Sequence, residues 1–172
     1  MMNGIVFLDR DGVINHLVER DGKLVSPRNI GDFKVHNGVF EAVLELKKAE
    51  FQIVVVTNQP DISRKKMLQS DLNKMTEELL DLGIDKIMVC PHSDEDYCHC
   101  RKPKPGMLLE HLRSIPNHPS NLWMIGDNAS DISAGKSVGA KTILVASGER
   151  SVETSADFRS PDLKSAVKLI IA

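Results

Sequence analysis

The sequence has few aromatic residues, little net charge and no long apolar run. Aromatic residues make up 4% of the 172 residues, which predicts an aliphatic core. The formal net charge of −2 provides no basic surface for nucleic acid. No apolar stretch approaches the ~20 residues that cross a bilayer, and the N-terminal residues lack the pattern of a secretory signal. We therefore expect one cytoplasmic domain over residues 1–172, monomeric, without a membrane or nucleic-acid partner.

Cysteine is also scarce, and the three cysteines cannot all pair with one another. All of them lie in residues 90–100, in the short motifs Cys-Pro-His and Cys-His-Cys, so their spacing reflects either metal chemistry or chance. Three thiolates and one imidazole complete a tetrahedral zinc site with no open position, which is the structural kind. The predicted ligands are Cys90, His92, Cys98 and Cys100, with His99 as an alternative to His92 and with Asp94 or Asp96 as less favoured ligands.

Short β-branched runs alternate with segments of helical period, which is typical of an α/β fold with a mainly parallel sheet. The predicted strands are residues 5–8, 52–57, 86–90, 122–125 and 141–146. The predicted helices are residues 39–47, 67–80, 105–112, 130–138 and 161–171, with Ser130 or Asp131 as the cap of the fourth. We expect a Rossmann-like three-layer sandwich, with residues 15–37 as a long functional loop.

Two acids and a glycine follow the first predicted strand, in the order Asp9-Arg10-Asp11-Gly12. The carboxyl ends of strands carry ligand sites in open α/β sheets, so both acids are candidates for chemistry on one ligand. An ordinary turn is the alternative, because Asp and Gly are common turn residues. A helix-loop-helix calcium loop is excluded, because its fifth and sixth positions would hold Val13 and Ile14.

Polar residues also follow three other predicted strands. Thr57 and Asn58 are hydrogen-bond donors for an anion at the end of the second strand, and Arg101 and Lys102 place positive charge before a helix N-terminus. Asp127 ends the fourth strand, and Asp131 follows it. Each group alone is also compatible with a turn, a solvated charge run or a helix cap.

Together these groups meet at one edge of a parallel sheet and form the inventory for phosphoryl transfer through an aspartyl-phosphate. A divalent cation would offset the repulsion between the acids. Magnesium is expected, because it prefers oxygen ligands and phosphate substrates and keeps several of its waters.

The motifs and their order resemble the haloacid dehalogenase superfamily of phosphohydrolases over nearly the whole chain. The resemblance implies that Asp9 is the nucleophile and Asp11 the acid and base, and that Thr57 and Lys102 hold the phosphoryl group. It further implies that Asp9, the backbone carbonyl of Asp11 and Asp127 bind Mg²⁺, with Asp131 and Asn128 in support. Lys102 is preferred to Lys104 because it directly precedes the first proline of a Lys-Pro-x-Pro element.

The zinc loop running into Arg-Lys-Pro is similar to a capless group that contains heptose 1,7-bisphosphate phosphatases and histidinol-phosphate phosphatases. Arg64 and the continuation at residues 104–107 are similar to the heptose enzymes, whereas the short spacing between Cys90 and Cys98 is similar to the histidinol type. The resemblance favours a Mg²⁺-dependent phosphomonoesterase of heptose precursor synthesis, with the heptose bisphosphate as its substrate. Histidinol phosphate or another small sugar phosphate is the alternative.

Two positions depart from the heptose pattern. Pro60-Asp61 replaces Ser-Gly, and this added acid would either exclude a second phosphate or reorient the loop. Asn128 replaces a basic residue. Candidate recognition residues on the long loop are Glu19, Arg20, Lys23 and Arg28.

Two classes of function without phosphatase activity are the alternatives. A signalling receiver domain would place its phospho-accepting Asp after the third strand, but that strand ends in Cys90. A non-catalytic member that binds ligands is suggested only by the two departures.

Overall fold

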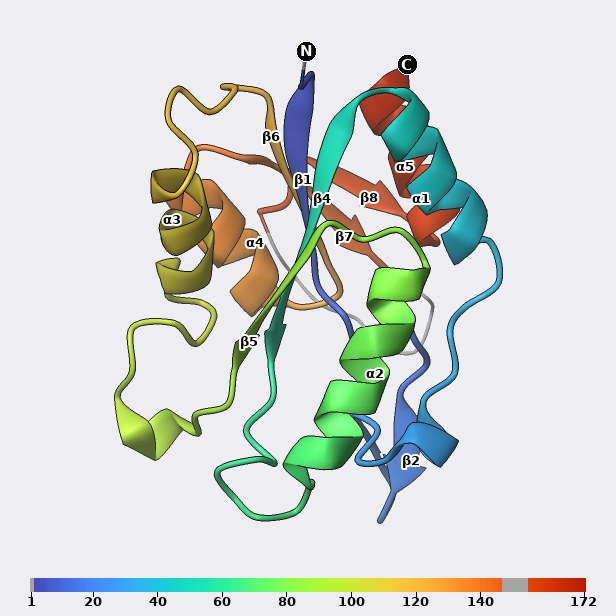
Figure 1. The fold of residues 1–172 in the computed structure, drawn as a ribbon, viewed down its shortest axis with the longest axis vertical. Helices are drawn as coiled ribbons and strands as arrows, with labels where there is room; N and C mark the ends of the chain where they lie inside the picture. The colour runs from blue at the N-terminus through green and yellow to red at the C-terminus, as the bar shows by residue number, and fades with distance from the viewer. Residues whose placement is uncertain (1, 147–154) are drawn as a thin grey trace.

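The computed structural model describes residues 2–146 and 155–172, and its centre is a six-stranded parallel sheet (Figure 1). The strand order is β5-β4-β1-β6-β7-β8, and every neighbouring pair is parallel. The strands are β1 (Gly4–Leu8), β4 (Phe51–Asn58), β5 (Lys86–Cys90), β6 (Leu122–Gly126), β7 (Lys141–Val145) and β8 (Phe158–Ser160). Parallel strands are covered on both faces, which explains why β1 is buried at all five of its residues.

Five helices cover the two faces of the sheet and complete three layers. Figure 1 shows how they divide between the two sides of the sheet. On the first side lie α1 (Val39–Lys48), α2 (Gln69–Asp81) and α5 (Leu163–Ile171); on the second lie α3 (Gly106–Arg113) and α4 (Ala129–Ser137). This arrangement confirms the predicted α/β fold.

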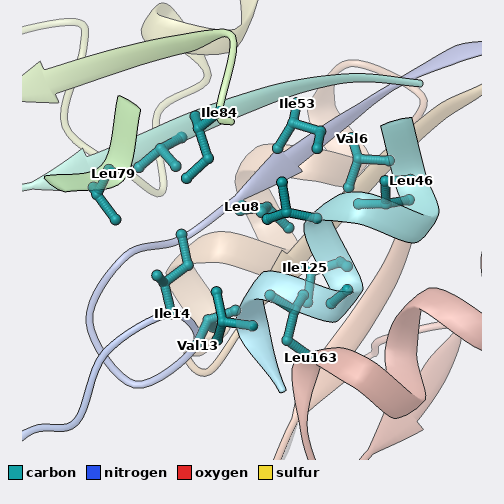
Figure 2. Packing of buried hydrophobic residues seen from close by; sticks show 14 of the residues in the cluster. Val6, Leu8, Val13, Ile14, Leu46, Ile53, Leu79, Ile84, Ile125 and Leu163 are labelled. Carbon is teal, nitrogen blue, oxygen red and sulfur yellow. The ribbon is translucent and has the colours of Figure 1, made fainter. Parts of the chain in front are cut away.

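Alternate side chains of β1 enter two separate hydrophobic clusters. Val6 and Leu8 belong to the cluster beneath α1, α2 and α5, where Figure 2 shows Leu8 between Leu46 and Ile14. Ile5 and Phe7 belong to the cluster beneath α3 and α4. Burying one such side chain stabilises the fold by about 1.5–3 kcal/mol, so the central strand is held firmly from both faces.

The segment between β1 and α1 contains a small hairpin and no further domain among the described residues. Its strands are β2 (Val18–Arg20) and β3 (Lys23–Val25), joined through Asp21 and Gly22, both with positive φ. A 3-10 helix, η1 (Ile30–Asp32), follows. The hairpin was not predicted, because three-residue strands leave too short an alternation to detect. Strand β8 was missed for the same reason.

Several predicted boundaries were wrong by one or two residues. Helix α4 is capped by Asn128, and Asp131 is its third residue, whose carboxylate accepts from the backbone NH of Asn128. Helix α3 begins at Gly106, so Pro105 caps it. Helix α2 begins at Gln69, and β7 ends at Val145. Capping contacts decide such ends, and composition alone does not reveal them.

None of the described helices has the length and apolar character that crossing a membrane requires.

Candidate active site

A cleft of about 730 Å³ is lined by residues at the ends of β1, β4 and β6. Figure 1 shows β4 ending at the lower side of the sheet. At the floor of the cleft, the ammonium group of Lys102 joins residues that are far apart in sequence. Its Nζ lies 2.7 Å from Asp9 Oδ1, 2.6 Å from Asp131 Oδ1 and 2.7 Å from the Val56 carbonyl. Only 4% of Lys102 is exposed, so its ammonium group interacts with these protein groups rather than with bulk solvent.

Burial and neighbouring charges shift the pKa values of both Asp9 and Lys102. Burial raises the pKa of Asp9, and the Asp131 carboxylate raises it further, against the opposing effect of Lys102. Burial alone would lower the pKa of Lys102, but Asp131 and Asp9 together raise it above its ordinary value. The lysine therefore stays charged, and the cluster favours the binding of a further cation.

Three carboxylates form a set that suits a divalent metal. Asp9, Asp127 and Asp131 each offer one oxygen, and these atoms lie within 4.8 Å of one another. Oxygen donors alone are the ligand chemistry that Mg²⁺ prefers, and Asp127 lines the cleft, so the set is open to the water ligands that Mg²⁺ usually keeps. Asp131 was predicted only to support the metal, but its carboxylate belongs to this set. The set does not contain the Asp11 side chain.

Two glycines allow these acids to approach the backbone. A Cβ on Gly126 would lie 2.1 Å from the Cβ of Asp131, and one on Gly12 would lie 2.2 Å from Asp127 Oδ2. Gly12 also has a φ of 87°, which side-chain-bearing residues rarely adopt. The Asp-Gly and Gly-Asp motifs therefore reflect steric needs of the site itself.

Donors from three side chains surround the Asp11 carboxylate. Arg10 donates through Nε at 2.9 Å and Nη2 at 3.0 Å, Asn15 donates at 2.9 Å, and Gln59 donates at 2.7 Å. Burial would raise the pKa of Asp11, but these contacts, led by the Arg10 charge, lower it below its ordinary value. The structure thus holds Asp11 ionised. The partners Arg10, Asn15 and Gln59 were not predicted as site residues, although Arg10 lies between Asp9 and Asp11 and Gln59 directly follows Thr57 and Asn58.

The polar residues at the end of β4 act mainly on other protein groups. Thr57 is 1% exposed, and its hydroxyl accepts a hydrogen bond from Gln59 at 2.8 Å. Asn58 uses both ends of its amide on the backbone of Lys102, donating to the carbonyl and accepting from the NH, each at 3.0 Å. Asn58 was predicted to bind substrate, and here it fixes the loop that carries Lys102.

The remaining predicted residues lie at the outer part of the cleft. Arg64, Arg101 and Asn128 all line it, and Arg101 Nε is 2.8 Å from Asp94 Oδ1. Arg101, and more weakly Arg64, lower the pKa of Asp94, so both arginines lie close enough to interact with this carboxylate. Arg20 instead pairs with Asp32 and is not among the cleft residues.

The four predicted zinc ligands form a compact cluster beside this cleft. Cys90, His92, Cys98 and Cys100 offer ligand atoms that all lie within 4.8 Å of one another. Cys90 Sγ is 3.6 Å from His92 Nδ1 and 3.6 Å from Cys98 Sγ, and Cys100 Sγ is 3.3 Å from His92 Nδ1. Tetrahedral ligands of zinc lie about 3.5–3.8 Å apart, so the donor set fits that ion. His99 is not part of the cluster.

The thiols of the cluster differ in how readily they ionise. Burial raises the pKa of Cys90. Burial also opposes ionisation of Cys98, but hydrogen bonds led by the Arg101 backbone NH lower its pKa to about 7. A bound cation would stabilise the ionised form of the buried Cys90 thiol. Structural metal sites bind their cysteines in this deprotonated form.

Comparisons with known proteins agree with this geometry. A family model described as HAD-hyrolase-like, where HAD stands for haloacid dehalogenase, matches residues 99–166. The D-glycero-beta-D-manno-heptose-1,7-bisphosphate 7-phosphatase of Photorhabdus laumondii subsp. laumondii is 40% identical over 174 residues, covering 91% of this chain and 88% of the relative. The chain belongs to the haloacid dehalogenase family. The same-named enzyme of Haemophilus influenzae is 37% identical, covering 86% of this chain and 84% of its own.

A solved structure shares the haloacid dehalogenase fold found here. The D,D-heptose 1,7-bisphosphate phosphatase from B. bronchiseptica, complexed with magnesium and phosphate, matches with a TM-score of 0.83 and 24% identity. The match covers 98% of each chain. At this identity the likeness concerns the fold, which agrees with the family assignment from the sequence relatives.

Proposed function

We propose that this protein is a cytoplasmic, magnesium-dependent phosphatase that removes the 7-phosphate of D-glycero-D-manno-heptose 1,7-bisphosphate, a heptose precursor of lipopolysaccharide or capsule. The observation that carries the proposal is Lys102 bridging Asp9 and Asp131 at the end of β1. The activity for which the two relatives are named supplies the substrate, and it favours the heptose bisphosphate over histidinol phosphate. We infer that residues 1–172 act as one domain.

In the first step Asp9 attacks the phosphorus. A bond forms between a carboxylate oxygen of Asp9 and phosphorus, and the bond from phosphorus to the sugar oxygen breaks. Asp11 gives its proton to the departing oxygen. The donors Arg10, Asn15 and Gln59 oppose protonation of Asp11, so proton uptake before this step has to overcome them.

In the second step water hydrolyses the aspartyl-phosphate. Asp11, now a carboxylate, accepts a proton from the water as its oxygen attacks phosphorus, and Asp9 is released with inorganic phosphate. The hydrogen bonds around Asp11 favour its ionised form and therefore suit this step. Lys102 carries positive charge beside Asp9 throughout and stabilises the charge on the transferring group.

Asp9, Asp127 and Asp131 would hold Mg²⁺, together with the backbone carbonyl of Asp11. When bound, the ion supplies positive charge to the phosphoryl oxygens. Lys102 alone does not balance the charge of the three carboxylates. A magnesium ion beside it would offset the remaining repulsion between them.

Cys90, His92, Cys98 and Cys100 would hold a structural Zn²⁺. The loop leads directly to Arg101 and Lys102, and the Arg101 backbone NH already contacts Cys98. Fixing the cysteines would therefore fix the start of the segment that carries the catalytic lysine.

Phosphate release from heptose 1,7-bisphosphate, histidinol phosphate and common sugar phosphates tests the proposal. We expect the heptose bisphosphate to have the highest kcat/KM, with no turnover in the presence of EDTA and recovery with Mg²⁺. A higher kcat/KM for histidinol phosphate would contradict the substrate, and turnover unaffected by EDTA would contradict the metal requirement.

A further inference from the structure

Beyond the catalytic carboxylates, the outer part of the cleft is strongly basic. Apart from Asp9, Asp11, Asp127 and Asp131, the described residues that line the cleft include two carboxylates, Asp61 and Asp94. Its cationic side chains are Lys23, Arg28, Arg64, Lys66 and Arg101. Because this excess of positive charge lies in the same cleft as Asp9 and Lys102, it suits an anionic group on the part of the substrate that is not hydrolysed.

Asp61 links two of these cations that come from different segments. Its Oδ2 is 2.6 Å from Nε of Arg28, which follows the β2–β3 hairpin. Its Oδ1 is 3.8 Å from Nη1 of Arg64, three residues farther along the chain. The Asp61 side chain is 14% exposed, compared with 31% for Arg28 and 42% for Arg64, so the acid lies beneath the two guanidinium groups.

The backbone around Asp61 is firmly placed. Its carbonyl accepts from the NH groups of Lys66 and Met67 at 2.8 and 3.0 Å. On either side, the Ile62 NH donates to the Gln59 carbonyl and the Ser63 NH donates to the Pro91 carbonyl. The loop is thus attached to both β4 and the segment after β5, and it holds the Asp61 carboxylate in one place.

The acid at position 61 was expected either to exclude a second phosphate or to reorient the loop, and this geometry favours the second of these effects. An isolated carboxylate would repel a phosphate, but Asp61 faces two guanidinium groups, and the three residues together carry a net positive charge. Arg28 contacts Asp61 through Nε, which leaves its two terminal nitrogens available for another anion.

We propose that Asp61 is a positioning residue that orients Arg28 and Arg64 to bind the second, non-hydrolysed phosphate of a sugar bisphosphate. The proposal rests on the proposed function and extends it to the residues that distinguish a bisphosphate from a monophosphate. The hairpin residue Arg28 and the loop residue Arg64 then form one anion site, because a single carboxylate ties them together.

The test compares kcat/KM for heptose 1,7-bisphosphate with kcat/KM for heptose 7-phosphate, which lacks only the second phosphate. We expect Arg28→Gln and Arg64→Gln each to lower this ratio about 10-fold, since each removes one charged hydrogen-bond donor. Asp61→Asn should lower it about five-fold, through KM rather than kcat, and Asp61→Glu should recover part of the loss. The triple variant Arg28→Gln/Arg64→Gln/Asp61→Asn should match Arg28→Gln/Arg64→Gln within about two-fold, because Asp61 acts through these two arginines.

Arg113→Gln, at the exposed end of α3, is the matched charge control and should leave the ratio unchanged. A higher ratio for Asp61→Asn would show that the acid repels the second phosphate and would overturn the proposal. An unchanged ratio in the Arg28 and Arg64 variants would overturn it as well, while leaving the proposed function intact. If the wild type hydrolysed neither ester, the proposed function would fail, and this inference with it.

Discussion

The carboxylate cluster (Asp9, Asp127 and Asp131) and the cysteine cluster (Cys90, His92, Cys98 and Cys100) are both compact sets of side chains whose chemistry suits a metal ion, yet they differ in how their charge is balanced. The first contains its own buried cation, Lys102, and opens onto a large cleft. The second consists of three thiols and one imidazole and contains no lysine or arginine. A site beside a cleft, with coordination positions left for other ligands, suits a metal that binds substrate. A closed site, in which four protein ligands fill every position, suits a metal that stabilises a loop.

Sequence separation distinguishes the two clusters as well. The cysteine cluster comes from eleven consecutive residues, 90–100, while Asp9 and Lys102 are 93 positions apart. A local cluster can form from one loop, but the carboxylate cluster requires the assembled sheet. Substitutions in the two clusters should therefore differ in their effects on catalysis and on metal content. Four substitutions test this difference.

The largest effect is expected for Asp9→Asn. The amide cannot attack phosphorus as the carboxylate does, so kcat should fall at least about 10⁴-fold. Steady-state phosphate release measures it, with Asp81→Asn at the end of α2 as a control that keeps wild-type rates. Equal rates for Asp9→Asn and wild type would end the aspartyl-phosphate mechanism.

Next in size is Lys102→Met, which keeps the side-chain length and removes the charge that balances Asp9 and Asp131. We expect kcat/KM to fall about 10²–10³-fold, the usual cost of one lost electrostatic contact to a transition state. Lys104→Met is the matched control, because Lys104 is exposed and its ammonium group donates to the Cys98 carbonyl rather than to a carboxylate of the site. Comparable losses in the two variants would contradict the assignment of Lys102.

Cys98→Ser tests the closed cluster. We expect zinc content to fall from about one ion per chain to near zero, because the site loses one of its four ligands. Activity should fall about 10-fold, since Arg101 and Lys102 follow the loop directly. Elemental analysis and phosphate release measure both, with His99→Ser as a control that keeps zinc. Full zinc binding by Cys98→Ser, or its loss in His99→Ser, would refute the ligand set.

The smallest effect is expected for Asp94→Asn, which removes the exposed partner of Arg101. Solvent screens this exposed ion pair, so KM should change only about two-fold. Substrate titration measures it. A loss as large as that of Cys98→Ser would mean that Asp94, rather than the cysteine cluster, positions Arg101.

Much of the site was predictable because its motifs follow buried strands. Asp9, Asp127 and Lys102 were placed correctly at one sheet edge, since parallel strands bring their carboxyl ends together. Asn58 was assigned to the substrate, but its amide binds the backbone of Lys102. An amide next to a strand end carries no sign of which neighbour it will contact, because that neighbour is 44 residues away.

Local patterns in the sequence determined the alternating fold, the strand-end acids and the four members of the cysteine cluster, because each depends on periodicity or short spacing. Only the tertiary structure decided that Asp131 lies within 4.8 Å of the Asp9 and Asp127 carboxylates, that Arg10, Asn15 and Gln59 donate to Asp11, and that Asp61 faces Arg28. The physical reason is that hydrogen bonds and ion pairs act over a few ångströms, and folding alone determines which distant side chains come within that range.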